Sequence, residues 1–325
     1  MHDDFYQINT LKHKIVNWLH SLMLLAGMAL LLGLLGWIFA GPVGIRWATI
    51  ITIVSLVISP HLSPRIILRW YAAKPISYQE APALYSVLRE LSQRAKLQNT
   101  PTLYYVPTKI LNAFTTGSRS NAAIAITDGL LNTLSMWELA SVIAHEVGHL
   151  KNNDLWIMNL SDTISRVTSF FSMSAQLLVF MNLPLLLTSG HHISWTGILV
   201  LIFAPTITVL LQMALSRTRE FDADLDAAML TGDPEGLASA LAKMERYQGG
   251  WMARIFFPGH REPQPSILRT HPQTQERIKR LLDLSPGRHL HQRLLHPYED
   301  GAFAFSAPSV RIRRQPRWRF GGIWY

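Results

Sequence analysis

This sequence of 325 residues contains no cysteine. The absence excludes disulfide-stapled scaffolds, iron–sulfur clusters, thiol catalysis and cysteine-based zinc fingers. It does not identify a cellular compartment, because reducing and oxidising environments both permit proteins without cysteine. Any metal site must be built from histidine and carboxylate side chains, and the sequence has 13 histidines from which to build one.

Charged residues are also scarce. They make up 16% of the sequence, whereas an ordinary soluble domain has roughly 25%. This composition argues against a disordered chain and against a nucleic-acid-binding tail protein, although the formal net charge is +9. The low average has a local cause, because the sequence contains long stretches without Asp, Glu, Lys or Arg.

The first uncharged stretch extends from Ile15 to Ala40 and has 26 residues. At about 1.5 Å per helical residue it is long enough to cross a bilayer core of about 30 Å. It is too long for the apolar region of a cleaved signal peptide, so we interpret it as a retained anchor. A second run, Trp47–Leu62, follows a turn at Gly41–Gly44, and the two predict a membrane hairpin over 15–62. A buried strand or core helix is the alternative for the second run, because 16 residues is marginal for a span.

A longer uncharged stretch covers Val167–Ser216 and has 50 residues. A turn at Ser189–His192 divides it into segments near 167–187 and 195–215. These predict a second membrane hairpin. The alternative is a pair of wholly buried helices, which is disfavoured because the remaining sequence is too short to cover four such segments.

Basic residues predict the orientation of these hairpins. They flank the outer ends of the apolar segments, whereas the connections Gly41–Arg46 and Ser189–Trp195 hold only Arg46. With an even number of spans, both ends of the chain and its middle part lie on one side, which the positive-inside rule predicts to be cytoplasmic. The flanking residues are Arg65, Arg69, Lys74, Lys151, Arg166, Arg217 and Arg219.

The more polar segments predict an α+β domain with a small sheet. A helix begins near Pro82 and has leucine and valine residues on one face. Segments 103–106 and 122–127 have the composition of strands, and residues 117–121 that of a turn. Ser135 followed by Glu138 is a capping-box signature, which predicts a helix as far as about Lys151.

The chemistry is expected on this last helix, where residues 145–149 read His-Glu-Val-Gly-His. Residues four apart share a helix face, so His145 and His149 can present two imidazole nitrogens to one Zn²⁺. Glu146 lies beside them and can act as a general base toward water activated by the metal. The alternative is a pair of surface histidines around a glutamate.

A catalytic zinc has three protein ligands and an open position. The third ligand is expected on the segment that follows the last apolar run. Glu220 and Asp224 share one helix face there, so one can bind the metal while the other hydrogen-bonds a ligand histidine. By residue pattern alone Glu220, Asp222 and Asp224 remain rival ligands.

Together these motifs resemble the HtpX-type membrane metallopeptidases, in the gluzincin group that also contains the zinc-dependent CAAX prenyl endopeptidases. The resemblance covers roughly residues 10–284. Its order of motifs, with a hydrophobic hairpin between the zinc ligands, is more specific than the zinc motif alone. The matching segments are 112–117 (Asn-Ala-Phe-Thr-Thr-Gly), 145–149, 216–224 and 270–272, together with Arg277.

The resemblance implies roles for particular residues. Glu220 would be the third zinc ligand and Asp224 would orient a ligand histidine. His271 would stabilise the oxyanion, with Arg277 beside it. Strand addition at Asn112, Ala113 and Phe114 would hold the substrate main chain.

Residue pattern alone leaves alternatives for several of these positions. His271 is equally compatible with a capping or structural role, and Arg277 with a solvated helix surface. Arg217 and Arg219 either steady the ligand helix or flank a membrane exit.

No family motif matches beyond about residue 286. This tail has seven arginines against Glu299 and Asp300, which is +5 of the net charge of +9, and it ends in interleaved aromatic residues. We interpret it as binding anionic lipid or packing against the catalytic domain. A flexible solvated tail and nucleic-acid binding are the alternatives.

The sequence thus predicts an integral membrane zinc endopeptidase that acts on membrane or membrane-associated proteins, in protein quality control. We expect one Zn²⁺ per chain, polypeptide substrates, contact with the lipid bilayer and no nucleic acid. The protein would cross the membrane several times, and in a bacterial host this would be the inner membrane. The predicted divisions are 1–14, the hairpin 15–62, catalytic part 63–166, the hairpin 167–216, catalytic part 217–285 and the tail 286–325.

Two rivals remain at this stage. One is a dedicated processing peptidase for lipidated or short peptides, which has the same chemistry and a different substrate. The other is a non-catalytic membrane scaffold stabilised by zinc. The intact Glu146 argues against the scaffold, because a structural zinc site needs no general base.

Overall fold

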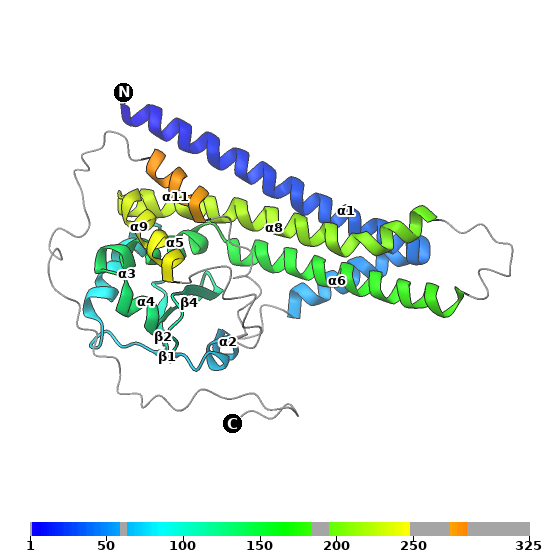
Figure 1. Ribbon diagram of the computed structural model, residues 1–325, viewed down its shortest axis with the longest axis horizontal. Helices are drawn as coiled ribbons and strands as arrows, with labels where there is room; N and C mark the ends of the chain where they lie inside the picture. The colour runs from blue at the N-terminus through cyan, green and yellow to red at the C-terminus, as the bar shows by residue number, and fades with distance from the viewer. Residues whose placement is uncertain (1, 59–63, 184–194, 248–273, 285–325) are drawn as a thin grey trace.

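The computed structural model describes residues 2–58, 64–183, 195–247 and 274–284. The predictions for His271, for the turn at Ser189–His192 and for the tail 286–325 lie outside these residues. Figure 1 shows two parts: the long helices α1, α6 and α8 run side by side toward one end, and the sheet with the shorter helices lies at the other. Each of the helices α1, α6 and α8 is in extensive contact with the other two.

Helix α1 (His2–Ile58) is interrupted at Ala40 and Gly41. Gly41 has φ +57° and ψ −139°, a conformation that favours glycine, and Pro42 follows it. Gly36 and Gly44 lie so close that a Cβ on Gly44 would be 1.9 Å from the Gly36 carbonyl oxygen. In a straight helix these residues would be about 12 Å apart, so the chain reverses between them, and in Figure 1 the blue ribbon turns back near the right-hand end of the long helices.

Three helices in the described residues are long and apolar enough to cross a membrane: Lys14–Val57 within α1, α6 (Asp154–Met181) and α8 (Trp195–Thr231). The four separate spans that were predicted are not confirmed, because the segment Lys14–Val57 counts as one candidate span although α1 is broken at Ala40 and Gly41. The predicted boundaries at 166/167 and 216/217 fall inside α6 and α8. Both helices continue past the apolar runs because their polar ends are buried in the rest of the protein.

A polar contact joins α6 to α8 inside the apolar part. Pro205 lies within α8 and has no N–H to donate to the carbonyl of Leu201, four residues earlier. The Ser172 hydroxyl donates to that carbonyl, and the Gln176 amide donates to it at 3.0 Å. Side chains of α6 therefore replace the bond that the proline removes, as expected for a helix pair in an apolar environment.

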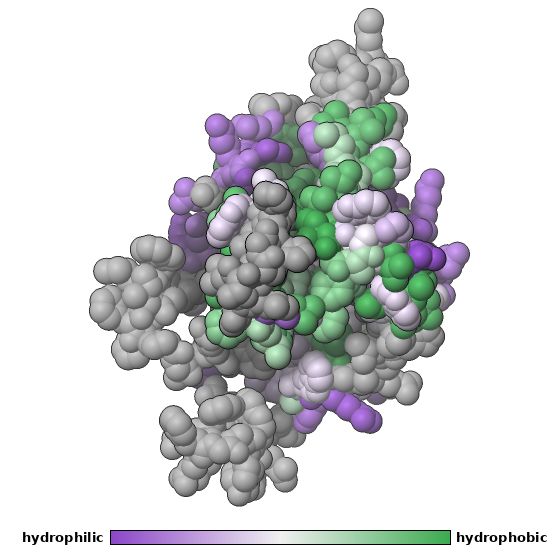
Figure 2. Space-filling view, turned by 90° about the vertical axis from the view of Figure 1, so that its right-hand side faces the viewer, coloured by the Kyte–Doolittle hydropathy of each residue, from purple (hydrophilic) through white to green (hydrophobic). Residues whose placement is uncertain are grey.

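Large apolar side chains are exposed along these helices. Leu30 is 75% exposed, Phe180 is 74% exposed and Trp195 is 69% exposed. Figure 2 looks at the right-hand side of Figure 1, and hydrophobic residues predominate in the centre of that face while hydrophilic ones gather at its margins. Apolar surface on this scale is stable when lipid covers it.

The other part contains a four-stranded sheet in the order β1-β2-β4-β3. Strands β2 and β4 are parallel, and the other two pairs are antiparallel. The strands predicted at 103–106 and 122–127 are confirmed as β2 and β4. The predicted turn is shorter than expected, because residues 117 and 118 extend β3. The strands are β1 (Lys74–Pro75), β2 (Thr102–Val106), β3 (Ala113–Ser118) and β4 (Asn121–Thr127).

Helix α5 (Met136–Lys151) occupies the middle of this part. The capping box predicted at its start is present: Ser135 accepts a hydrogen bond from the Glu138 amide, and the Glu138 carboxylate accepts one from the Ser135 amide at 2.9 Å. The buried core surrounds α5 with residues from the sheet, α3 and α9. The remaining helices are α2 (Pro64–Trp70), α3 (Pro82–Arg94), α4 (Asp128–Thr133), α9 (Pro234–Tyr247) and α11 (Thr274–Asp283).

Candidate metal centre and active site

The site lies where α5 crosses α8. A Cβ added to Gly148 would lie 3.2 Å from the Ala223 carbonyl oxygen and 3.3 Å from the Ala223 Cα. Because glycine has no side chain at this point, the two backbones approach closely. One face of α5 is therefore held against the part of α8 that carries Glu220 and Asp224.

His145, His149 and Glu220 come together at this crossing. Their candidate ligand atoms lie within 4.8 Å of one another. The two histidine Nε2 atoms are 3.2 Å apart. The distance from His145 Nε2 to the Glu220 Oε2 is 3.4 Å, and that from His149 Nε2 to the Oε1 is 3.7 Å. Tetrahedral zinc with bonds of about 2.0 Å requires ligands about 3.3 Å apart, so the donor set fits such an ion.

Asp224 and Arg277 support His145. The Asp224 Oδ1 lies 3.0 Å from the His145 Nδ1. Arg277, on α11, donates to both oxygens of Asp224, at 2.6 and 2.7 Å, and its Nη1 lies 3.0 Å from Glu220. Arg277 is buried, unlike the solvated helix residue that its local sequence allowed.

Asp154 supports His149 in the same way. Its Oδ2 lies 2.8 Å from the His149 Nδ1. When a carboxylate accepts a hydrogen bond from Nδ1–H, the lone pair of that histidine is on Nε2. His149 is thus arranged to present Nε2 to an ion, and the Nε2 of His145 lies 3.2 Å from the His149 Nε2.

The carboxylates around the cluster favour positive charge. Burial lowers the pKa of His145, but the hydrogen bonds to Asp224 and Glu220 outweigh it and raise that pKa to about 10. Burial likewise lowers the pKa of His149, and the bond to Asp154 outweighs it, so that the pKa lies above its ordinary value of 6.5. The same carboxylates would stabilise a divalent cation at the Nε2 atoms.

Glu146, which follows His145 on α5, is in contact with the edge strand β3. The Thr115 hydroxyl donates to the Glu146 carboxylate at 2.6 Å, and both side chains are buried. Ala113 and Phe114 lie on β3 with buried side chains, so only their backbone is available to a ligand. Asn112 precedes the strand, and its backbone is tied to Thr127 of β4. Among the described residues β3 pairs on one edge only, with β4.

Residues 78–285, which make up more than half of the chain, match peptidase family M48. The chain belongs to peptidase family M48. It is accordingly a metalloprotease, a class of hydrolase, and its three long apolar helices make it an integral membrane protein. The predicted resemblance to HtpX-type metallopeptidases is confirmed.

Two proteases illustrate how similar the M48 relatives are. A protease HtpX homolog from Burkholderia ambifaria is 34% identical over 283 residues, which cover 83% of this chain and 97% of the relative. A protease HtpX homolog from Desulfatibacillum aliphaticivorans is 34% identical over 281 residues, with coverage of 83% and 90%. Among solved structures, S. mikatae Ste24p matches with a TM-score of 0.49 and 19% identity, over 83% of this chain and 67% of that one.

Sequence reasoning missed one residue of this M48 site, Asp154, and left another undecided, Arg219. Asp154 follows His149 by five residues, beyond the recognised motif. The structure buries Arg219 between Asp154 and Asp222, whereas Arg217 is exposed. Arg219 is therefore an interior residue beside the candidate metal ligands. Because its charge is paired with buried carboxylates, it should not be counted among the basic residues that predict membrane orientation.

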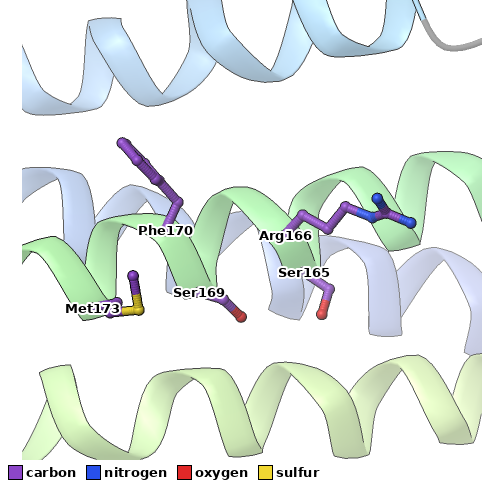
Figure 3. A pocket seen from close by; sticks show the side chains of 5 residues that line it. All are labelled: Ser165, Arg166, Ser169, Phe170 and Met173. Atoms are coloured by element: carbon purple, nitrogen blue, oxygen red, sulfur yellow. The ribbon is translucent and has the colours of Figure 1, made fainter. Parts of the chain in front are cut away.

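A separate cavity of about 360 Å³ lies on the apolar part of the M48 chain. Five residues of α6 line it, and none was proposed for the active site. Figure 3 shows Phe170 and Arg166 pointing to one side of α6 and Ser165 and Ser169 to the other. Arg166 is paired with Asp162, one turn earlier on the same helix. This cavity therefore contains none of the chemistry assembled at the crossing of α5 and α8. The lining residues are Ser165, Arg166, Ser169, Phe170 and Met173.

Proposed function

We propose that this chain is a membrane zinc endopeptidase that hydrolyses peptide bonds of membrane or membrane-associated proteins, in protein quality control. The observation that carries the proposal is the convergence of His145, His149 and Glu220, with their Nε2 and carboxylate atoms at zinc-ligand spacing. Glu220 lies on α8, which is also one of the apolar helices. The chemistry and the membrane therefore share a structural element.

One zinc per chain would be held by His145, His149 and Glu220. When bound, zinc would supply a Lewis acid that activates water and polarises the peptide carbonyl. Two imidazoles and a carboxylate are a set typical of catalytic zinc. Asp224 orients His145, and Arg277 holds Asp224 and Glu220 in place, so we assign both of these residues to positioning the ligands.

Glu146 would be the general base. It follows His145 directly on α5, and its carboxylate accepts a hydrogen bond from Thr115. That bond holds one oxygen and leaves the other to accept a proton from the attacking water. The carboxylate can then return the proton to the departing amine.

The substrate main chain would bind along β3 by strand addition. Asn112, Ala113 and Phe114 begin the edge of the sheet that carries Thr115, and a peptide paired there would lie beside Glu146. His271 is proposed to stabilise the oxyanion of the tetrahedral intermediate, as the resemblance implies.

The proposed topology has four spans in two hairpins, 15–62 and 167–216, with the catalytic parts 63–166 and 217–285 on the cytoplasmic face. The reversal of α1 between Gly36 and Gly44 supports the first hairpin. The basic tail 286–325 would contact anionic lipid. In a bacterial host the protein would lie in the inner membrane.

The decisive experiment compares the full chain with Glu146→Gln, both purified in detergent and loaded with zinc. Wild type should cleave a membrane-protein substrate, and the variant should lose about 10²- to 10⁴-fold in rate while it retains zinc. Retained cleavage in Glu146→Gln would refute the assignment of the base. Zinc binding by wild type without cleavage of any peptide would favour the scaffold.

A second experiment addresses the substrate. Comparing the membrane proteomes of cells that express wild type or Glu146→Gln should show many membrane proteins accumulating with the variant. Accumulation of a single short or lipidated peptide would instead favour a dedicated processing peptidase.

A further inference from the structure

A row of polar contacts, buried in its middle and part-buried at its two ends, connects the first apolar helix to a proposed zinc ligand. The Asn17 amide of α1 donates to Asp222 at 2.5 Å. The other oxygen of Asp222 lies 2.8 Å from Arg219, and the Nη1 of Arg219 lies 3.5 Å from the Oδ1 of Asp154, an ion-pair contact without a hydrogen bond. Asp154 contacts the Nδ1 of His149 at 2.8 Å. The row thus passes from α1 through α8 and α6 to α5.

Burial makes these contacts depend on one another. Asp154, Arg219 and Asp222 are 2%, 5% and 4% exposed, so water cannot take the place of a missing partner. Arg219 lies between the two carboxylates and keeps either from being an isolated buried charge.

Helix α1 completes this arrangement from its side. The side-chain amide of Asn17 donates to Asp222, and the main-chain carbonyl oxygen of Asn17, which Asn17→Ala leaves in place, accepts a hydrogen bond from Arg219 at 3.2 Å. Both partners, Asp222 and Arg219, lie on α8. Asn17 therefore holds both partners of the Arg219–Asp222 pair in one orientation.

We propose that α1 is a working part of the metal centre: Asn17, Asp222 and Arg219 hold Asp154, and Asp154 holds the ring of His149 so that its Nε2 faces the ion. This inference rests on the proposed zinc site and adds to it a set of positioning residues from the apolar helices. It assigns a role in metal affinity to a side chain more than a hundred residues away in sequence from any ligand.

The chain contains a matched contact that does not reach a ligand. Lys14 lies about one turn before Asn17 on α1, and its Nζ is 2.7 Å from the buried Asp226. Asp226 is also held by Lys151 at 2.6 Å and by Asn152 at 2.7 Å. Removing Lys14 weakens the attachment of α1 to α8 while leaving every histidine contact in place.

The experiment measures zinc affinity by chelator competition for the purified full chain, in a Glu146→Gln background that prevents self-cleavage. Asp154→Ala should weaken zinc binding about 10- to 100-fold, and Asp154→Asn less, because the amide oxygen still accepts a bond from Nδ1–H. Asn17→Ala should weaken it by a smaller factor. Lys14→Met should change affinity less than twofold, even where it lowers the melting temperature as much as Asn17→Ala does.

Two results would overturn the inference. Zinc binding of Asp154→Asn and Asn17→Ala equal to that of the parent would show that the row is only structural. A loss in Lys14→Met as large as in Asn17→Ala would show that attachment of α1 in general, and not this row, sets the affinity. Failure of the parent to bind zinc would instead refute the proposed function, so the two failures are distinguishable.

Discussion

The two histidines of the candidate metal centre have the same local support from different parts of the molecule. The Nδ1 of His145 faces Asp224, which Arg277 of α11 holds with two hydrogen bonds. The Nδ1 of His149 faces Asp154, which Arg219 contacts at 3.5 Å. The His145 half thus depends on a helix of the polar part, whereas the His149 half depends on α6 and, through Asn17, on α1.

The candidate metal centre thus draws support from both parts of the fold. If both histidines were held by residues of the polar part alone, the metal centre would not depend on the apolar helices. Here one imidazole would lose its support when α6 or α1 shifts, and the other when α11 shifts. The candidate metal centre therefore lies at the interface between the two parts of the protein. Glu220 on α8 is close to both His145 and His149.

The largest effect should come from removing the arginine of the His145 half. Arg277→Ala leaves Asp224 and Glu220 buried without their cation, and breaking a buried ion pair costs about 3–5 kcal/mol. We expect a much lower melting temperature in detergent and loss of peptidase activity. Lys279→Ala, an exposed neighbour on α11, is the control and should leave both unchanged. If Arg277→Ala melted at the same temperature as wild type, Arg277 would not be the residue that stabilises Asp224 and Glu220 beside His145.

A second change should affect both halves together. Gly148→Val forces a side chain against Ala223, where even a Cβ would lie only 3.2 Å from a backbone oxygen. Overpacking of this kind costs about 1–3 kcal/mol, and it moves α8 with Glu220 and Asp224 away from α5. Thermal unfolding and zinc affinity should both decrease, more for valine than for Gly148→Ala. If only stability changed, the close crossing would not be what brings the ligands together.

A finer comparison uses lysine at the two arginine positions. Lysine cannot reproduce the two parallel bonds of Arg277 to Asp224, so Arg277→Lys should weaken zinc binding about tenfold. Arg219 lies 3.5 Å from Asp154, the carboxylate that contacts His149, which is a longer contact than those of Arg277 with Asp224. Arg219→Lys should therefore weaken zinc binding less. Chelator competition on both variants tests the order, and the reverse order would show that the His149 half is the more tightly held.

The smallest effect should come from a carboxylate outside both halves. Glu138 is largely buried, which raises its pKa, but hydrogen bonds from Lys243, Ser239 and Ser135 outweigh burial, so the pKa lies below its ordinary value of 4.5. The folded protein therefore binds this proton less tightly than the unfolded chain does. The stabilisation is present above about pH 4.5 and is lost as the pH falls through the lower folded value.

Melting curves between pH 6 and pH 3 test this expectation. Glu138→Gln should be less stable than wild type at pH 6, by about 1 kcal/mol, and the difference should shrink toward pH 3. Glu138→Gln should leave the two halves of the metal centre unaffected. At neutral pH, the zinc affinity of Asp154→Asn relative to that of Asp224→Asn should therefore be the same whether or not Glu138→Gln is also present. A difference in stability that grew on acidification would mean that Glu138 is not held as its contacts indicate.

Local patterns in the sequence were reliable where the chemistry is local. The capping box of Ser135 and Glu138, the strands at 103–106 and 122–127, and the spacing of His145 and His149 each involve residues close in sequence. Periodicity did not predict strands β1 and β3, because β1 has two residues and β3 is buried along most of its length. The apolar segments were found, but their ends were not, because α6 and α8 continue into buried polar residues.

Composition and short helical repeats were enough to predict the class of protein, the metal-binding face of α5 and the presence of apolar helices. Residue pattern alone left Glu220, Asp222 and Asp224 as rivals for the third ligand, which only the family resemblance resolved toward Glu220, and it left Arg219 between two roles. The tertiary structure brought Glu220 to the histidines, Asp224 to Arg277 and Asp222 to Asn17. These three acids lie close together on one helix yet face different neighbours, and only the packing of α1, α5, α6 and α11 around α8 decides which neighbour each one meets.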